Sequence, residues 1–112
     1  MAIESVSRAR QFVRSALQRF PGDTVDTAEL LTSELATNAI VHGHTAFDVM
    51  VSDADGTLRI AVTDQSGLMP VLLSPGASDV RGRGLLILDR LSDRWGTADN
   101  RPGKTVWFDL AT

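Results

Sequence analysis

Glu34-Leu35-Ala36-Thr37-Asn38-Ala39-Ile40-Val41-His42-Gly43 is the stretch of this sequence that decides the fold and points to a site. At about 100° per residue it continues an amphipathic helix predicted over residues 26–43. Glu34, Asn38 and His42 fall inside the apolar arc of that helix, spaced one turn apart. The apolar members of the arc are Ala28, Leu30, Leu31, Leu35, Ala39 and Val41.

A carboxylate buried without a partner is strongly unfavourable, so the polar stripe formed by Glu34, Asn38 and His42 needs a charged or hydrogen-bonding partner. Taken singly, Asn38 and His42 are also compatible with polar side chains whose hydrogen bonds are satisfied in the core, and Glu34 with a helix rotated so that it reaches water. Their common spacing of one turn favours a binding site. We expect the stripe to line a cavity that a polar ligand, an ion or water fills.

The overall composition limits the classes of protein to which the chain can belong. A chain of 112 residues suits one domain over 1–112, and 43% hydrophobic with 22% charged residues is typical of a globular protein. A net charge of −3 argues against nucleic-acid binding by electrostatics, and the lack of cysteine excludes disulfides and thiol chemistry. No long apolar run and no signal-peptide pattern is present, so no membrane contact and a soluble, cytoplasmic protein are expected.

A first helix is predicted over residues 4–20, ended by Pro21-Gly22. Its basic residues form either a solvated face or a docking face for an acidic partner. They are Arg8, Arg10, Arg14 and Arg19.

Alternating residues predict strands over 47–52 and 58–63, joined at Asp55-Gly56, a strong hairpin signal. A long loop over 65–81, a helix over 84–91 and strands over 95–98 and 104–110 follow. This order predicts an α+β two-layer sandwich, with a largely antiparallel sheet and helices on one face.

Two further features carry chemistry. Asp64 has the same parity as the apolar residues of its strand, so its carboxylate is expected on the buried face. There it either accepts hydrogen bonds from an amino group of a planar ligand or closes the strand in an Asx-turn. Arg81-Gly82-Arg83-Gly84 opens the next helix, where exposed N–H groups and two arginines suit an anion, although such glycines also simply cap helices.

Other sites are excluded by the sequence. No segment has the P-loop spacing, no serine sits in a nucleophile elbow, and no zinc-ligand spacing is present. His42 and His44 point apart on a helix, so they are not a metal pair.

The chain resembles the GHKL (Bergerat-fold) ATPases, and within them the anti-sigma-factor serine/threonine kinase branch, like the short ATP-binding regulatory proteins of actinobacteria. The resemblance covers almost the whole chain. Glu34-x-x-x-Asn38-Ala39 with His42-Gly43 resembles the N-box of that family, and Val62 to Gly67 with Pro70 resembles its first glycine box. Gly82-Arg83-Gly84-Leu85 resembles the second, and Arg94 to Gly96 with Gly103 to Phe108 resembles the closing strands.

The resemblance implies ATP and Mg²⁺ as ligands. It implies that Asn38 holds Mg²⁺, that Glu34 is the general base, and that His42 belongs to the nucleotide site. Asp64 would accept from the adenine amino group. Phosphate and base contacts would come from Gly67, Gly82, Gly84 and the N–H of Leu85, with Arg83 as a charge partner by position.

The sequence also departs from the family pattern. The first box is usually Asp-x-Gly-x-Gly, whereas here it reads Asp64-Gln65-Ser66-Gly67-Leu68-Met69. Gly103-Lys104 replaces the common Gly-Thr. A strand often found before the first helix is missing, which leaves a sheet edge able to recruit a partner. A chain of this length also has no room for a dimerising phosphoacceptor domain.

The resemblance implies an anti-sigma-type kinase that phosphorylates an anti-anti-sigma protein. A sigma factor is a further expected partner, and a homodimer is compatible with the sequence. Two alternatives stay open. One is a non-catalytic, nucleotide-dependent protein-binding module, and the other is a binding protein that no longer takes nucleotide.

Overall fold

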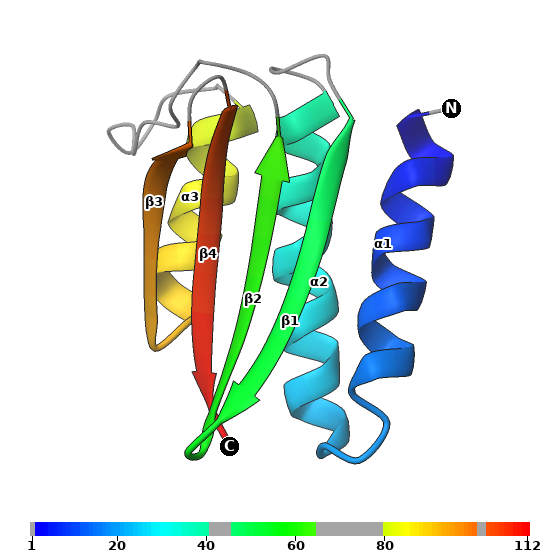
Figure 1. Ribbon diagram of the computed structural model, residues 1–112, viewed down its shortest axis with the longest axis vertical. Coiled ribbons are helices and arrows are strands. Elements are labelled where there is room, and N and C mark those ends of the chain that lie inside the picture. The colour runs from blue at the N-terminus through cyan, green and yellow to red at the C-terminus, as the bar shows by residue number, and fades with distance from the viewer. Residues whose placement is uncertain (1, 41–45, 65–79, 101–102) are drawn as a thin grey trace.

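The computed structural model describes residues 2–40, 46–64, 80–100 and 103–112; for residues 2, 3, 80–85 and 100 it describes the backbone alone. Three helices and four strands follow one another in these described residues (Figure 1). They are α1 (Ala2–Ala16), α2 (Gly22–Asn38), β1 (Phe47–Ala54), β2 (Thr57–Asp64), α3 (Val80–Leu91), β3 (Arg94–Asn100) and β4 (Gly103–Ala111).

The four strands form one sheet in the order β1-β2-β4-β3, and every neighbouring pair is antiparallel. The helices lie on one face of this sheet, with α2 and α3 behind it and α1 next to α2 beyond the β1 edge (Figure 1). The expected α+β two-layer sandwich is therefore confirmed. It follows from strands that alternate apolar and polar residues and so need cover on one face only.

The hairpin between β1 and β2 turns at Asp55-Gly56, as its sequence predicts. Asp55 has φ 54° and Gly56 has φ 78°, the left-handed values that a two-residue type I′ turn requires at both positions. The turn sets the register, in which Ala54 opposes Thr57 and Phe47 opposes Asp64. The last residue of β2 is thereby placed beside the start of β1.

The core lies between the sheet and the helices. In β2, Leu58, Ile60 and Val62 are buried at period two, and they lie on the face that α2 covers. The largest fully buried side chain is Phe108 of β4, which Ile60 opposes across the sheet. The helices contribute the other main core residues, namely Val13, Leu17, Val25, Ala28, Leu31, Leu35 and Leu88.

Helix bounds and faces differ from expectation in α1 and α2. Helix α1 ends at Ala16 rather than 20, and α2 begins at Gly22, directly after Pro21, rather than at Asp26. Leu30, expected in the apolar arc of α2, is 44% exposed, whereas Thr32 is fully buried. The reason is that α2 packs against α1 as well as the sheet, and this contact rotates its buried arc.

The sheet face without helices is covered by its own side chains. Arg59 Nε and Nη2 donate to the two carboxylate oxygens of Asp109 at 2.7 and 2.9 Å, and Arg94 Nη2 donates to Asp109 at 3.0 Å. The Arg59 guanidinium lies 4.0 Å from the ring centre of Trp107. The hydrogen bond from Arg59, helped by Arg94, holds the pKa of Asp109 below its ordinary value.

Candidate functional site

Glu34 and Asn38 lie one turn apart near the end of α2, and both side chains are half-buried. Asn38 Oδ1 is buried, yet it accepts no hydrogen bond from any residue that the structure describes. Buried carbonyl oxygens are nearly always paired, so an orphan of this kind suggests a ligand atom. His42, the third member of the stripe, lies outside the described residues.

The orphaned oxygen also tests whether Mg²⁺ fits this site. Magnesium prefers oxygen ligands and takes few of them from the protein, because it keeps several waters or phosphate oxygens. An amide oxygen such as Asn38 Oδ1 suits that role. Within the described residues no group of three acidic or histidine side chains could hold a metal ion, so a full protein cage is not found there.

Glu34 faces a groove between α1 and α2. This groove has a volume of about 460 Å³ and includes Arg10, Leu30 and Ser33 in its walls. Arg14, on the same wall, forms ion pairs with Glu29 and with Asp26 of α2. Glu34 therefore lies on the side of α2 that faces this groove and α1.

Asp64 is the last residue of β2 and is 3% exposed, so the expectation that it turns inward is confirmed. Lys104 Nζ of β4 lies 2.8 Å from Asp64 Oδ2, and the two side chains are 10% and 5% exposed. The Asp64 carboxylate, expected to accept from the adenine amino group, is therefore already paired with the buried ammonium of Lys104. The alternative Asx-turn involves the residues that follow, which lie outside the described part of the chain.

Lys104 is the residue at this site whose role the sequence analysis did not derive. The sequence does mark the position as unusual, because Lys104 stands where the family pattern has threonine. The pairing itself depends on the strand register, which places Lys104 directly opposite Asp64 on the neighbouring strand. A second polar pair joins the same two strands one residue further along, where the hydroxyl oxygens of Thr63 and Thr105 lie 2.7 Å apart.

The glycine-rich segment is placed differently from expectation. Helix α3 begins at Val80, so Gly82, Arg83, Gly84 and Leu85 lie within its first turns rather than before it. A helix start still offers N–H groups without carbonyl partners, but these now belong to residues near Val80 and Gly82. The side chain of Arg83 and the whole of Gly67 lie outside what the structure describes.

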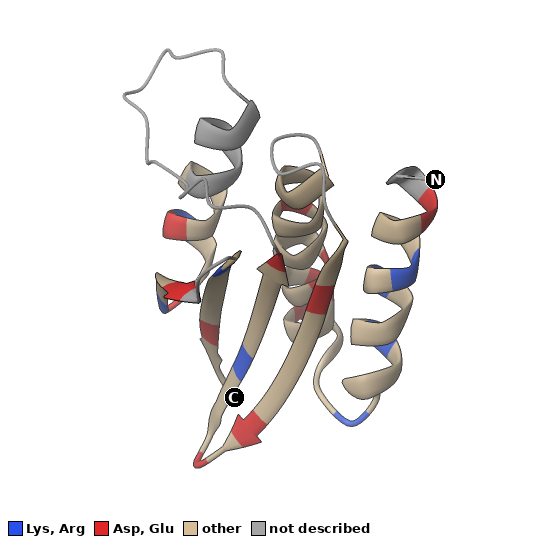
Figure 2. Ribbon diagram, turned by 45° about the horizontal axis from the view of Figure 1, so that its top comes forward, with Lys and Arg blue, Asp and Glu red and all other residues tan. Residues whose placement is uncertain are grey.

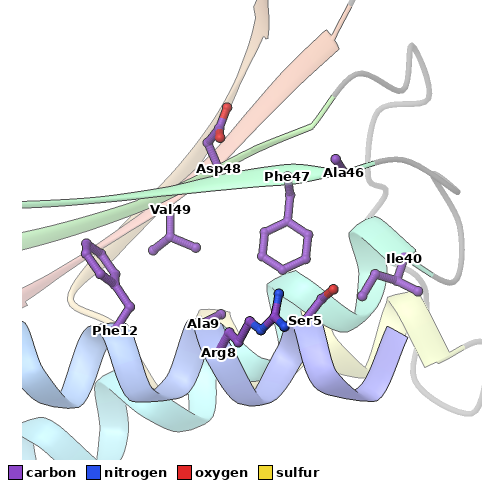
Figure 3. A pocket seen from close by; sticks show the side chains of 9 residues that line it. All are labelled: Ser5, Arg8, Ala9, Phe12, Ile40, Ala46, Phe47, Asp48 and Val49. Atoms are coloured by element: carbon purple, nitrogen blue, oxygen red, sulfur yellow. The ribbon is translucent and has the colours of Figure 1, made fainter. Parts of the chain in front are cut away.

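The hollow expected between the α2 stripe and Asp64 is not defined by the described residues. What they do define is a separate groove of about 380 Å³ between α1 and β1 (Figure 3). Phe47 and Val49 point into it from β1 and Phe12 from α1, whereas Asp48 points to the other side of the strand. This groove is mostly apolar and opens beside the outer edge of the sheet.

Basic residues recur along α1 and in the turn that follows it (Figure 2), and only some of them form ion pairs with described residues. Arg14 contacts the acids of α2, and Arg19 Nη2 lies 3.1 Å from Asp53. Neither Arg8 nor Arg10 forms an ion pair with any described residue, although Arg10 donates to Ser7. Part of this basic face is therefore occupied by ion pairs within the chain, and the choice between a solvated face and a docking face stays open.

Comparison with known families agrees with this geometry. Residues 1–110 match the model of the family described as "Histidine kinase-like ATPase domain". The chain belongs to this family. The GHKL part of the resemblance is thereby confirmed, and membership in the histidine kinase-like ATPase family implies an ATP-binding site.

Solved structures of histidine kinases share the fold. The chain is similar to the blue-light activated histidine kinase of Erythrobacter litoralis EL346, with 24% identity and a TM-score of 0.62, over 81% of this chain and 31% of that one. It is similar to a histidine kinase domain of the same protein at 19% identity and TM-score 0.62, over 95% and 58% of the two chains.

The catalytic domain of histidine kinase ThkA, in a nucleotide-free form, gives 14% identity and a TM-score of 0.65, over 96% of this chain and 90% of that one. The chain therefore spans 31% and 58% of the two Erythrobacter chains but nearly all of the ThkA domain. No curated protein sequence matches it. Within the described residues, no helix combines the length and apolarity needed to cross a membrane.

Proposed function

We propose that this chain is an ATP-binding regulatory protein of the anti-sigma-factor type, a serine/threonine kinase that acts on an anti-anti-sigma protein. A sigma factor is proposed as a second partner, and a homodimer as the assembly. The observation that carries the proposal is the buried Oδ1 of Asn38, which has no hydrogen-bond partner among the described residues and lies one turn after Glu34 in a histidine kinase-like ATPase domain.

The chemistry assigned to Glu34 is general-base catalysis. Its carboxylate accepts the proton of the substrate hydroxyl, whose oxygen attacks the γ-phosphorus of ATP while the bond to the β-phosphate oxygen breaks. The opening of Glu34 toward the α1–α2 groove supports this role, since a protein substrate has to reach it. Asn38 Oδ1 would hold Mg²⁺, which neutralises phosphate charge when bound.

The ion pair between Lys104 and Asp64 favours the non-catalytic module as a second candidate. A carboxylate already paired with a buried ammonium is a poorer acceptor for an adenine amino group than a free one. Such a module would change its affinity for a protein partner with the nucleotide state and would need no base. Glu34→Gln would then leave its function intact.

Transfer of labelled γ-phosphate from ATP to candidate antagonist proteins tests the kinase. Glu34→Gln should lower the transfer rate at least about a hundredfold while ATP affinity stays within about threefold, because the base acts only in the transition state. Asp23→Asn is the matched control, since it removes an exposed carboxylate from the same helix at a position that does not line the groove. Equal transfer rates for Glu34→Gln and wild type would refute the kinase mechanism.

A further inference from the structure

The sheet face opposite the helices, termed the open face, carries an apolar row that crosses all four strands (Figure 1). The buried residues of each strand face the helices, so Met50 of β1, Ala61 of β2 and Trp107 of β4 lie on the open face. The strand register places these three residues side by side and continues the row to Gly96 of β3. Met50 is 67% exposed, the highest value among the large hydrophobic side chains of the described residues.

The residue types on the open face are those of an interface centre. Met, Trp and Arg are enriched at the centres of protein–protein interfaces, and Trp and Arg often dominate the binding energy there. Arg59 and Arg94 lie on the open face next to the apolar row, because their common partner Asp109 is in the row beside Trp107. The Arg59 guanidinium stacks on the Trp107 ring. The open face therefore presents one large, preorganised stack beside an exposed methionine.

Large and small residues alternate along the apolar row, since Met50, Ala61, Trp107 and Gly96 follow one another. Suppose that a second copy packs on the open face about a two-fold axis parallel to the strands, between β2 and β4. Then β1 faces β3 of the second copy, and β2 faces β4. Met50 meets the position of Gly96, and the Trp107 stack meets Ala61. Large residues opposite small ones let two layers interdigitate, whereas a two-fold axis across the strands would set Trp107 against its own copy.

The exposed charges of the open face fit the same arrangement. One cross-strand row begins at Asp48 of β1 and ends at Ala98 of β3, and another begins at Ser52 and ends at Arg94. In the arrangement about the parallel axis, Asp48 faces Ala98 of the second copy and Arg94 faces Ser52. Neither exposed charge therefore meets a like charge, which would weaken association.

Resting on the homodimer proposed above, we propose that the open face is its interface, with two copies packed face to face about a two-fold axis parallel to β2 and β4. Four strands of about eight residues span roughly 20 by 27 Å, so the contact area is roughly 500 Å² per copy. This area is typical of weak, reversible complexes, and a dissociation constant on the order of micromolar is expected.

Sedimentation equilibrium of the whole chain without nucleotide, from about 1 to 500 μM, tests the interface. Wild type is expected to form dimers in this range. Met50→Lys should raise the dissociation constant at least about tenfold, because it places a charge in the apolar row. Leu91→Lys is the matched control, since Leu91 is also an exposed hydrophobic residue but lies on α3, and it should behave like wild type.

A wild-type chain that stays monomeric at about 500 μM, or dimers that Met50→Lys leaves unchanged, would overturn the inference. The kinase is judged by phosphate transfer and ATP binding, which are separate measurements. A monomer that transfers phosphate refutes the interface alone, and a dimer that binds no ATP refutes the kinase alone.

Cross-linking tests the arrangement of the two copies. The chain contains no cysteine, so Asp48→Cys and Ala98→Cys, both at exposed positions, each introduce a single thiol. A short bismaleimide should cross-link a mixture of the two variants, because residues 48 and 98 face each other across the interface. Each variant by itself should give little product, since its two thiols lie at opposite margins of the dimer. Equal cross-linking in the mixture and in the separate variants would overturn the proposed arrangement.

Discussion

The indole ring of Trp107 lies directly over Gly96 on the neighbouring strand, so closely that a Cβ at residue 96 would stand 2.7 Å from ring atom Cζ2. The two residues are Cα partners between β3 and β4. Packing an aromatic ring over a glycine is a known way to cover a strand position without a side chain. The Arg59 guanidinium stacks on the same ring, 4.0 Å from its centre.

Gly96→Ala is expected to destabilise the chain by about 1–3 kcal/mol, because the ring has to move away from its stack with Arg59. Urea unfolding followed by circular dichroism measures the loss. In a background of Trp107→Val the same glycine substitution should cost little, since the smaller side chain leaves room. An equal cost in both backgrounds would contradict the steric explanation.

Thr32→Val is expected to stabilise the chain by roughly 0.5–2 kcal/mol. Thr32 is fully buried, and its Oγ1 has no hydrogen-bond partner among the residues that the structure describes. Valine has the same shape, so it removes the unpaired hydroxyl without opening a cavity. The midpoint of urea unfolding should rise, whereas Thr37→Val, at a half-buried position of the same helix, should change it much less. A lower midpoint for Thr32→Val would mean that the hydroxyl is satisfied.

The acid limb of the stability curve should depend on Asp109. Because Arg59 and Arg94 hold its pKa below the ordinary value, its charge stabilises the folded state at pH above the unfolded-state pKa. That contribution is lost as the pH falls through the lowered folded-state pKa, that is, below about 4. Asp109→Asn should reduce stability at pH 7 by about 1–3 kcal/mol and flatten this part of the acid dependence.

Unfolding free energies between pH 7 and pH 3 check the role of Asp109. Asp55→Asn is the control, since it removes an exposed carboxylate while Asn-Gly preserves the type I′ turn. An Asp109→Asn chain that loses stability in acid as steeply as wild type would show that Asp109 does not carry the pH dependence.

Asn38→Ala should weaken ATP binding at least about tenfold in the presence of Mg²⁺ and have little effect in EDTA, because the proposed role of Oδ1 is to hold the ion. Calorimetry under the two conditions measures both affinities. Thr37→Ala, one residue away and half-buried, is the control. Equal losses with and without Mg²⁺ would assign Asn38 to the nucleotide itself and not to the metal.

Local sequence patterns were sufficient to predict the architecture. The period-two alternation of residues 58–63, the Asp55-Gly56 turn and the helical periodicity around Leu31 and Leu35 each act over a few residues, and all three predictions were confirmed. Element ends were less accurate, since Pro21 allows α2 to begin at Gly22, and α3 begins at Val80. Ends depend on competition between capping and packing, which a short window does not contain.

The candidate site likewise has one part that local sequence patterns predict and another that depends on tertiary contacts. The residue order by itself places Glu34 and Asn38 one turn apart and Asp64 on the inner face of its strand, because helix and strand periods are local properties of the backbone. The partners of these groups depend on contacts between distant segments. Lys104 meets Asp64 40 residues away along the chain, and Asp109 meets Arg59 50 residues away. Only the antiparallel register of β2 and β4 brings those charges together, and burial in the assembled sheet keeps the Lys104–Asp64 pair from separating into water.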